Sequence, residues 1–167
     1  LTSFSRTKLM GSISQEFSYH KRHLPHWQQG GYTYFITFRS IRGILPDGAL
    51  KKTKEHILYR HSKQYELLFG VVMPDHVHLL LRPMEKDDGS WISLSEIMKS
   101  LKGSSARSIN KLLSTSGSVW QSESFDRMVR DEKELHEKWE YMRNNPIKAG
   151  LVDGFNQYPF YVSPRRF

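Results

Sequence analysis

The chain has 167 residues, with 25 Lys and Arg against 17 Asp and Glu, so its formal charge is +8. This length is enough for one domain with a substantial core, and the positive charge favours a polyanionic partner, although ordinary solubility gives the same excess. The absence of cysteine excludes disulfides and thiolate metal sites, and it agrees with a cytoplasmic location. No apolar run approaches the roughly 20 residues of a membrane span, so we expect no membrane segment.

The N-terminal part of the chain divides into two stretches. Residues 1–20 lack the apolar core of a signal peptide, and we expect them to be poorly ordered. We expect residues 21–167 to form a single domain. Basic residues lie close to an aromatic residue at 21–27, a composition that suits unstacked bases, so Arg22 and Trp27 are candidate DNA contacts.

The remaining chain alternates between strand and helix patterns. The predicted elements are a strand at 32–38, a polar helix at 51–64, an apolar strand at 67–73, a strand from His76, a helix from Ser93, short strands near 119–120 and 126–129, and a last helix at 131–144. The order β-α-β-β-α-β, followed by a helix, is the split βαβ pattern. It predicts an α+β, ferredoxin-like palm with one central antiparallel sheet and helices packed on it.

Two of these helices carry local signals. Ser93 and Glu96 have the spacing of a capping box, which starts the helix from Ser93. Pro146 disfavours helical geometry at Asn145, so we expect the last helix to end there or just before. Cations away from much of the apolar stripe of the helix from Ser93 are candidate DNA contacts. They are Lys99, Lys102, Arg107 and Lys111.

The most informative feature is the pair His76 and His78, separated by one valine in an apolar run. Alternate side chains of a strand point the same way, and their backbones lie roughly 6.6 Å apart. Two imidazoles at that separation can converge on one divalent ion. The alternative is a histidine pair on a solvated sheet face, and the spacing alone does not decide between the two.

A tyrosine on the last predicted helix lies away from that helix's packed side. At 100° per residue the apolar stripe is formed by Leu135, Trp139 and Met142, and Tyr141 lies roughly 100–160° from it. Asn145 and Lys138 project on the side of Tyr141. Packing of this helix therefore does not explain the tyrosine, although it can still pack against the C-terminal tail.

These residue types together point to a particular chemistry. A phenol can act as a nucleophile when a cation such as Lys138, or a metal ion, lowers the cost of forming the phenolate. The electrophile that fits the basic chain is a phosphodiester, whose nonbridging oxygen a metal ion can neutralise. An oxygen from Asn145 can be the third ligand beside His76 and His78. Imidazole and oxygen donors suit Mg²⁺ or Mn²⁺.

At this point two segments resemble a known family. The segment 73–81, Met-Pro-Asp-His-Val-His-Leu-Leu-Leu, resembles the His-hydrophobic-His strand of single-tyrosine transposases. The segment 141–152, from Tyr141 through Asn-Pro to Ala-Gly-Leu-Val, resembles the tyrosine segment of the REP-associated tyrosine transposases. Stretches at 22–27, 94–103 and 119–127 are also similar. The residue before the first histidine is often Asn in that family, whereas this chain has Asp75.

The resemblance implies a function. It implies metal-dependent cleavage and rejoining of single-stranded DNA near palindromic hairpins by a cytoplasmic, nucleoid-associated prokaryotic protein, acting as a monomer or a homodimer. It implies Tyr141 as the nucleophile that keeps the 5′-phosphate, with His76, His78 and Asn145 as metal ligands. A domesticated relative that binds hairpins without cutting them is one alternative. An RNA-binding sheet domain of the same element order is another, but such domains place aromatic residues where this strand has histidines.

Overall fold

The computed structural model of the chain describes residues 17–20 and 26–164, and it consists of a five-stranded sheet, a two-stranded sheet and three α-helices. The five-stranded sheet has the order β6-β3-β5-β4-β7 and is antiparallel throughout. Its strands are β3 (Tyr34–Arg39), β4 (Tyr65–Val72), β5 (His76–Pro83), β6 (Phe125–Met128) and β7 (Tyr161–Val162). A separate pair contains β1 (Phe17–His20) and β2 (His26–Gln29).

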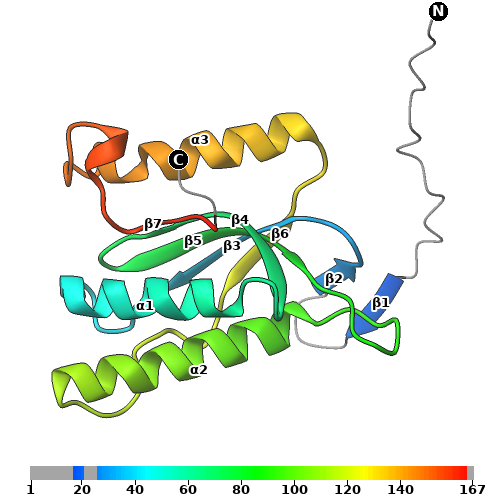
Figure 1. Cartoon of the computed structure of the whole chain (residues 1–167), viewed down its shortest axis with the longest axis horizontal. Coiled ribbons are helices and arrows are strands. Elements are labelled where there is room, and N and C mark those ends of the chain that lie inside the picture. Colours follow the sequence, from blue (N-terminus) through cyan, green and yellow to red (C-terminus); the bar gives the residue numbers. More distant parts are fainter. Residues whose placement is uncertain (1–16, 21–25, 165–167) are drawn as a thin grey trace, which may run out of the picture.

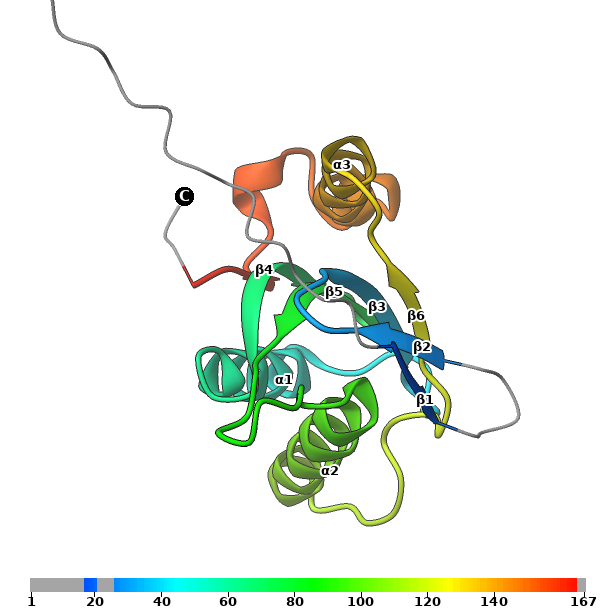
Figure 2. The same ribbon diagram turned by 90° about the vertical axis from the view of Figure 1, so that its right-hand side faces the viewer.

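Helices cover both faces of the five-stranded sheet. The helices α1 (Asp47–Arg60) and α2 (Leu94–Leu113) lie side by side on one face, and α3 (Glu132–Lys148) lies on the other (Figures 1 and 2). A short 3-10 helix, η1 (Phe155–Gln157), joins α3 to β7. The order β3-α1-β4-β5-α2-β6 confirms the predicted α+β, ferredoxin-like palm.

Two apolar clusters lie on opposite faces of this sheet. Val77, Leu79 and Leu81 of β5 point into the larger cluster, beneath α1 and α2. Leu80 points the other way, into a smaller cluster beneath α3 and the C-terminal segment. This alternation places the even-numbered residues of β5, including both histidines, on the α3 side.

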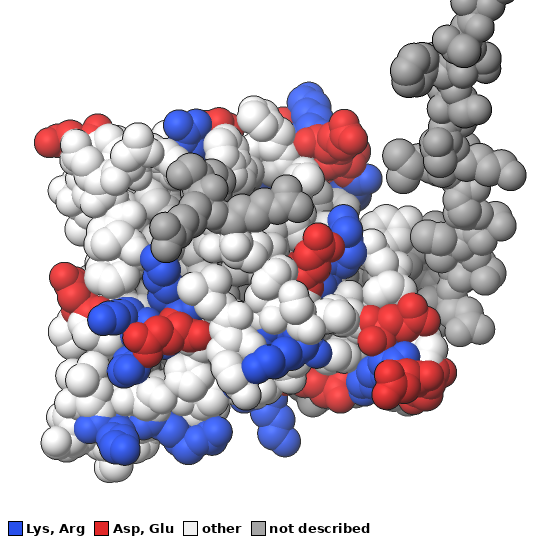
Figure 3. Space-filling view, viewed as in Figure 1, with Lys and Arg blue, Asp and Glu red and all other residues white. Residues whose placement is uncertain are grey.

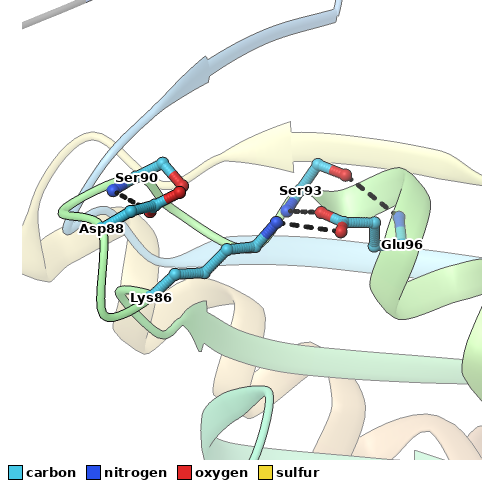
Figure 4. Close-up of polar contacts among 5 residues, drawn as sticks. All are labelled: Lys86, Asp88, Ser90, Ser93 and Glu96. Atoms are coloured by element: carbon cyan, nitrogen blue, oxygen red, sulfur yellow. Dashed lines mark hydrogen bonds and ion pairs between the residues drawn. The ribbon is translucent and has the colours of Figure 1, made fainter.

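Helix α2 begins with the predicted cap. Ser93 accepts a hydrogen bond from the backbone N–H of Glu96 at 3.1 Å, and the Glu96 carboxylate accepts one from the N–H of Ser93 at 2.8 Å (Figure 4). Lys86 adds a 3.0 Å ion pair to the same carboxylate. These bonds satisfy amide groups that the first turn of a helix leaves unpaired.

Three predicted helix boundaries are wrong. The first helix begins at Asp47 rather than 51, because the carbonyl of Pro46 accepts the amides of Ala49 and Leu50, and it ends at Arg60 rather than 64. The last helix continues through Pro146 to Lys148. Proline removes only its own N–H, and the next bonds remain, from Ala149 N–H to Asn145 and from Leu151 N–H to Pro146, each at 3.0 Å. Asn145 is therefore helical.

Two further expectations concern the chain's periphery. The predicted disorder of 1–20 falls mostly outside the described residues, although 17–20 form β1. Within the described part of the chain, no helix combines the length and apolar character needed to cross a membrane.

Candidate active site

The histidine pair lies at the start of β5, on the face that α3 covers. The ring centroids of His76 and His78 are 4.7 Å apart, so both side chains project from the same face, as the alternation predicted. His78 is 4% exposed. The alternative of a solvated pair is therefore wrong for His78.

The surroundings of His78 keep its ring neutral and fix its orientation. The Thr37 hydroxyl lies 2.7 Å from Nδ1, and the Phe35 ring stacks on the imidazole with centroids 5.3 Å apart. Burial lowers the pKa of His78 to about 3, with the charges of His76 and Arg39 adding to this effect. Its Nε2 atom is buried and has no hydrogen-bond partner among the described residues.

His76 is held by an acidic neighbour. Its Nδ1 atom lies 2.6 Å from Oδ1 of Asp75, whose other oxygen is 3.6 Å from the Arg39 guanidinium. With the proton on Nδ1 donated to Asp75, Nε2 of His76 carries the free lone pair. A carboxylate that fixes an imidazole in this way is the usual support of a metal-binding histidine. Asp75, which departs from the family pattern, thus orients the first histidine.

The donor set fits a divalent cation in part. An unpartnered buried imidazole nitrogen is costly unless a ligand meets it, and a neutral ring is the form that binds a metal. Among the described residues, no group of three or more His, Cys, Asp and Glu side chains is close enough to hold an ion. A third protein ligand must therefore be of another type, and an amide oxygen qualifies. Asn145 is partly exposed, and its side chain bonds to no other described residue.

The predicted tyrosine lies on α3, over the sheet face that carries the histidines. Tyr141 of α3 lies with its ring centroid 5.3 Å from that of His78 and 6.2 Å from that of Phe35, and it is 46% exposed. The stripe that packs α3 is the predicted one, with Met142 fully buried. Among the described residues, the ring contacts of Tyr141 are with His78 and Phe35, whereas Tyr161 of the C-terminal tail donates from its hydroxyl to the carbonyl of Arg143.

The predicted basic residues lie on both faces of the sheet. Lys138 is at the site, with Nζ 4.9 Å from the centre of the Phe35 ring. The four predicted cations of α2 lie on the opposite face, where Figure 3 shows Lys and Arg side chains along the lower margin of the molecule. Nζ of Lys102 donates to the carbonyls of Gln121, Ser122 and Glu123, and burial lowers its pKa.

Two of the predicted contacts cannot be placed. Arg22 lies outside the described residues, and the Trp27 side chain lies outside what the structure describes of β2. Conversely, sequence reasoning missed Thr37 and Phe35, which hold His78. The alternation of the strand at 32–38 was visible, but only the pairing of Thr37 with His78 across β3 and β5 reveals their role.

Together, the fold and the site define a transposase-like domain, in which a helical tyrosine faces two strand histidines. The chain belongs to the family described as Transposase IS200 like, which matches residues 31–145. The match confirms the resemblance seen in the sequence.

Individual relatives agree with this assignment. A Haemophilus influenzae protein, named provisionally as a REP-associated tyrosine transposase, is 27% identical over 117 residues, which cover 67% of this chain. The match spans 63% of the length of that protein. The REP-associated tyrosine transposase of Escherichia coli is 23% identical over 137 residues, covering 81% of this chain and 78% of the relative.

A solved structure shares the fold. It is a REP-associated tyrosine transposase bound to a REP hairpin, and it superposes with a TM-score of 0.64 at 20% identity. The similarity covers 86% of this chain and 81% of the other.

Proposed function

We propose that this protein cleaves and rejoins single-stranded DNA next to hairpins, through a covalent bond between Tyr141 and a 5′-phosphate. The observation that carries the proposal is the ring of Tyr141 lying 5.3 Å from that of His78, whose Nε2 atom is buried and meets no partner in the described part of the chain. A tyrosine half-exposed above the histidine pair is accessible to a strand. The solved structural relative, which holds a REP hairpin, supports the hairpin as partner.

The chemistry proposed for Tyr141 is a transesterification. The phenolic oxygen attacks phosphorus and forms a new O–P bond, while the bond from phosphorus to the 3′ oxygen breaks. The phenol gives its proton to solvent, and the departing 3′ oxygen gains one to become a hydroxyl. A 3′-hydroxyl of another strand end can reverse the step, which joins DNA without an external energy source.

His76 and His78 would hold a Mg²⁺ or Mn²⁺ ion, with Asn145 as the third ligand. A bound ion would withdraw charge from a nonbridging phosphate oxygen and hold it in place. Asp75 and Thr37 contact the Nδ1 atoms of the two imidazoles, which leaves the Nε2 atoms to hold the ion. Arg39 and Lys138 flank the histidines and are available to bind neighbouring phosphates.

The direct test is the variant Tyr141→Phe. We expect covalent attachment of hairpin DNA with unpaired flanks to be lost, because the nucleophilic oxygen is absent, while DNA affinity changes by less than about threefold, since one exposed hydroxyl is worth about 0.5 kcal/mol or less in binding. Attachment is measured by denaturing gel electrophoresis, and affinity by fluorescence anisotropy.

Tyr59 provides the matched control, because it is exposed but lies on α1, across the sheet. Tyr59→Phe should attach DNA as the unaltered protein does. Undiminished attachment by Tyr141→Phe would disprove the assigned nucleophile, and binding without any attachment by the unaltered protein would indicate the non-cleaving hairpin binder instead.

Removal of divalent ions gives a second test. Cleavage should stop in EDTA and return with Mg²⁺ or Mn²⁺, because without the ion the two imidazoles and the amide would hold no Lewis acid against the phosphate. In addition, Mn²⁺ should bind the DNA-free protein, and His78→Ala should abolish that binding when it is measured by calorimetry. Full cleavage in the presence of chelator would contradict a metal role for the histidine pair.

A further inference from the structure

An exposed aromatic side chain, Phe125, begins the edge strand β6 and has no role in the site described above. It is 58% exposed, and among the residues that the structure describes neither a ring nor a cation packs on it. A single exposed apolar residue is common on protein surfaces and needs no explanation by itself. Its position in the sheet is what makes Phe125 informative.

Strand register places Phe125 on the face that carries the histidines. Phe125 is paired with Thr37 across β6 and β3, and Thr37 is paired with His78 across β3 and β5. Directly paired residues of neighbouring strands project from the same face. Two residues further along β6, Arg127 forms a 2.8 Å ion pair with Glu134 of α3, which confirms the direction. Phe125 thus lies two strand spacings, roughly 10 Å, from His78.

The course of α3 brings Tyr141 to the same level of the sheet. Near its start, α3 contacts Arg127 through Glu134, and further along it contacts His78 through Tyr141. The ring of Tyr141 lies above two rows of the sheet, the row of Phe35 and Arg127 and the row of His78, Thr37 and Phe125. The phenol and the exposed ring border the same stretch of sheet surface.

The charge around this stretch is suited to a nucleic acid backbone. Arg39, two residues beyond Thr37 on the same face of β3, has a side chain that is 55% exposed. Lys138 lies over Phe35 at the other side of the histidines. Cations that meet phosphates, combined with an open aromatic face, are the two components of single-strand binding surfaces.

We propose that Phe125 is a stacking platform for an unpaired nucleobase of the nucleotide next to the phosphodiester that Tyr141 attacks. The inference rests on the proposed function and adds a base-binding site to it. A base held on Phe125 would fix the direction of the strand across the histidine pair. Because every base has a π-face, the platform would tolerate any sequence at that nucleotide.

The test compares two proteins on two DNA probes in a binding cycle. The proteins are Tyr141→Phe and the double variant Tyr141→Phe with Phe125→Ala, so that binding is measured without cleavage. One probe is a hairpin with unpaired thymidine flanks, and the other is the same hairpin with abasic flanks. Phe125→Ala should weaken binding of the thymidine probe by about 5- to 100-fold and leave binding of the abasic probe unchanged within about twofold.

Phe125→Trp should retain the preference for thymidine flanks, because it keeps an aromatic face, whereas Phe125→Leu should lose most of it. Tyr59→Ala, which removes a similarly exposed ring on the opposite face, should weaken binding of each probe by less than about twofold. Because the ring of Phe125 is exposed, circular dichroism and the unfolding temperature should be unchanged in all these variants.

Equal weakening of both probes by Phe125→Ala would overturn the platform, and so would no weakening of either. Neither result would bear on Tyr141, whose role is decided by covalent attachment of DNA. Conversely, if the attachment test ruled out Tyr141 as the nucleophile, the thymidine-dependent binding at Phe125 could still be measured. The two proposals therefore fail by different observations.

Discussion

His78 shows how the sheet prepares a single side chain for its task. Its pKa of about 3 keeps the ring neutral at any pH at which the protein would act, so a proton does not compete with a cation for Nε2. When the lone pair is on Nε2, the Nδ1–H group donates to Thr37. A hydroxyl on the neighbouring strand thereby holds the ring in a fixed orientation and is compatible with the tautomer that leaves Nε2 free.

Thr37→Val should therefore weaken Mn²⁺ binding by about 10-fold to 100-fold, because it retains the shape of the side chain and removes the hydroxyl that fixes the ring. Binding is measured by isothermal titration calorimetry of the DNA-free protein. Thr115→Val serves as the control, since Thr115 lies in the loop after α2 and bonds to Asn110 and Arg42. Unchanged Mn²⁺ affinity in Thr37→Val would show that Thr37 does not orient the ligand.

At the scale of the element, the sequence determined most of each helix and strand but not how they meet. The alternation around His76 and His78 and the off-stripe position of Tyr141 were both visible in the sequence, since each follows from the period of one element. The support of His78 by Thr37, 41 residues away, depends on the register of β3 against β5 and was not visible. The end of the last helix was predicted too early at Pro146, because a buried proline in the last turn removes one hydrogen bond and leaves the others.

The cap at the start of α2 predicts how the free energy of unfolding depends on pH. Ser93→Ala should lower the free energy of unfolding by about 1 kcal/mol, because it removes the cap of the first turn. The bonds to Ser93 and Lys86 hold the pKa of Glu96 at about 2, below its usual 4.5. The carboxylate therefore stabilises the fold fully above about pH 4.5, and this contribution disappears as the pH falls toward 2.

Urea unfolding of Glu96→Gln should show the corresponding difference. The variant should be less stable than the unaltered protein at pH 6, and the gap should close as the pH is lowered toward 2. Ser122→Ala is a suitable control, since Ser122 contributes a backbone carbonyl but no side-chain bond to the fold. A gap that stays constant with pH would mean that the charge of Glu96 plays no part in the cap.

At the scale of the whole molecule, the sheet separates the site from the α2 cations. Tyr141 lies on α3 and the histidines lie on the sheet face beneath it. Lys99 and Lys111 belong to α2, which covers the other face (Figure 2). The net charge of +8 predicted a polyanionic partner from the sequence, but it does not say which face that partner meets. Only the layered arrangement distinguishes the two groups of cations.

Single charge removals on the two faces should therefore differ. Lys138→Ala should reduce the slope of log affinity against log salt by about 1, because under the proposed function the lysine beside the site would contact a phosphate of the attacked strand. Lys111→Ala should leave the slope within experimental error. Affinity for hairpin DNA is measured by fluorescence anisotropy over a range of NaCl concentrations. An equal reduction by both variants would mean that the DNA extends around to α2.

The unpartnered nitrogen of His78 has a consequence for how the protein can change over generations. Leaving a buried acceptor unmet costs about 1–3 kcal/mol, a large share of a small domain's margin against unfolding. An apolar residue at this position would remove that penalty and strengthen the fold while destroying the proposed ion site. Under the proposed function, copies released from selection for cleavage should thus drift toward greater stability, and a histidine retained here would mark a lineage in which the proposed reaction is still under selection.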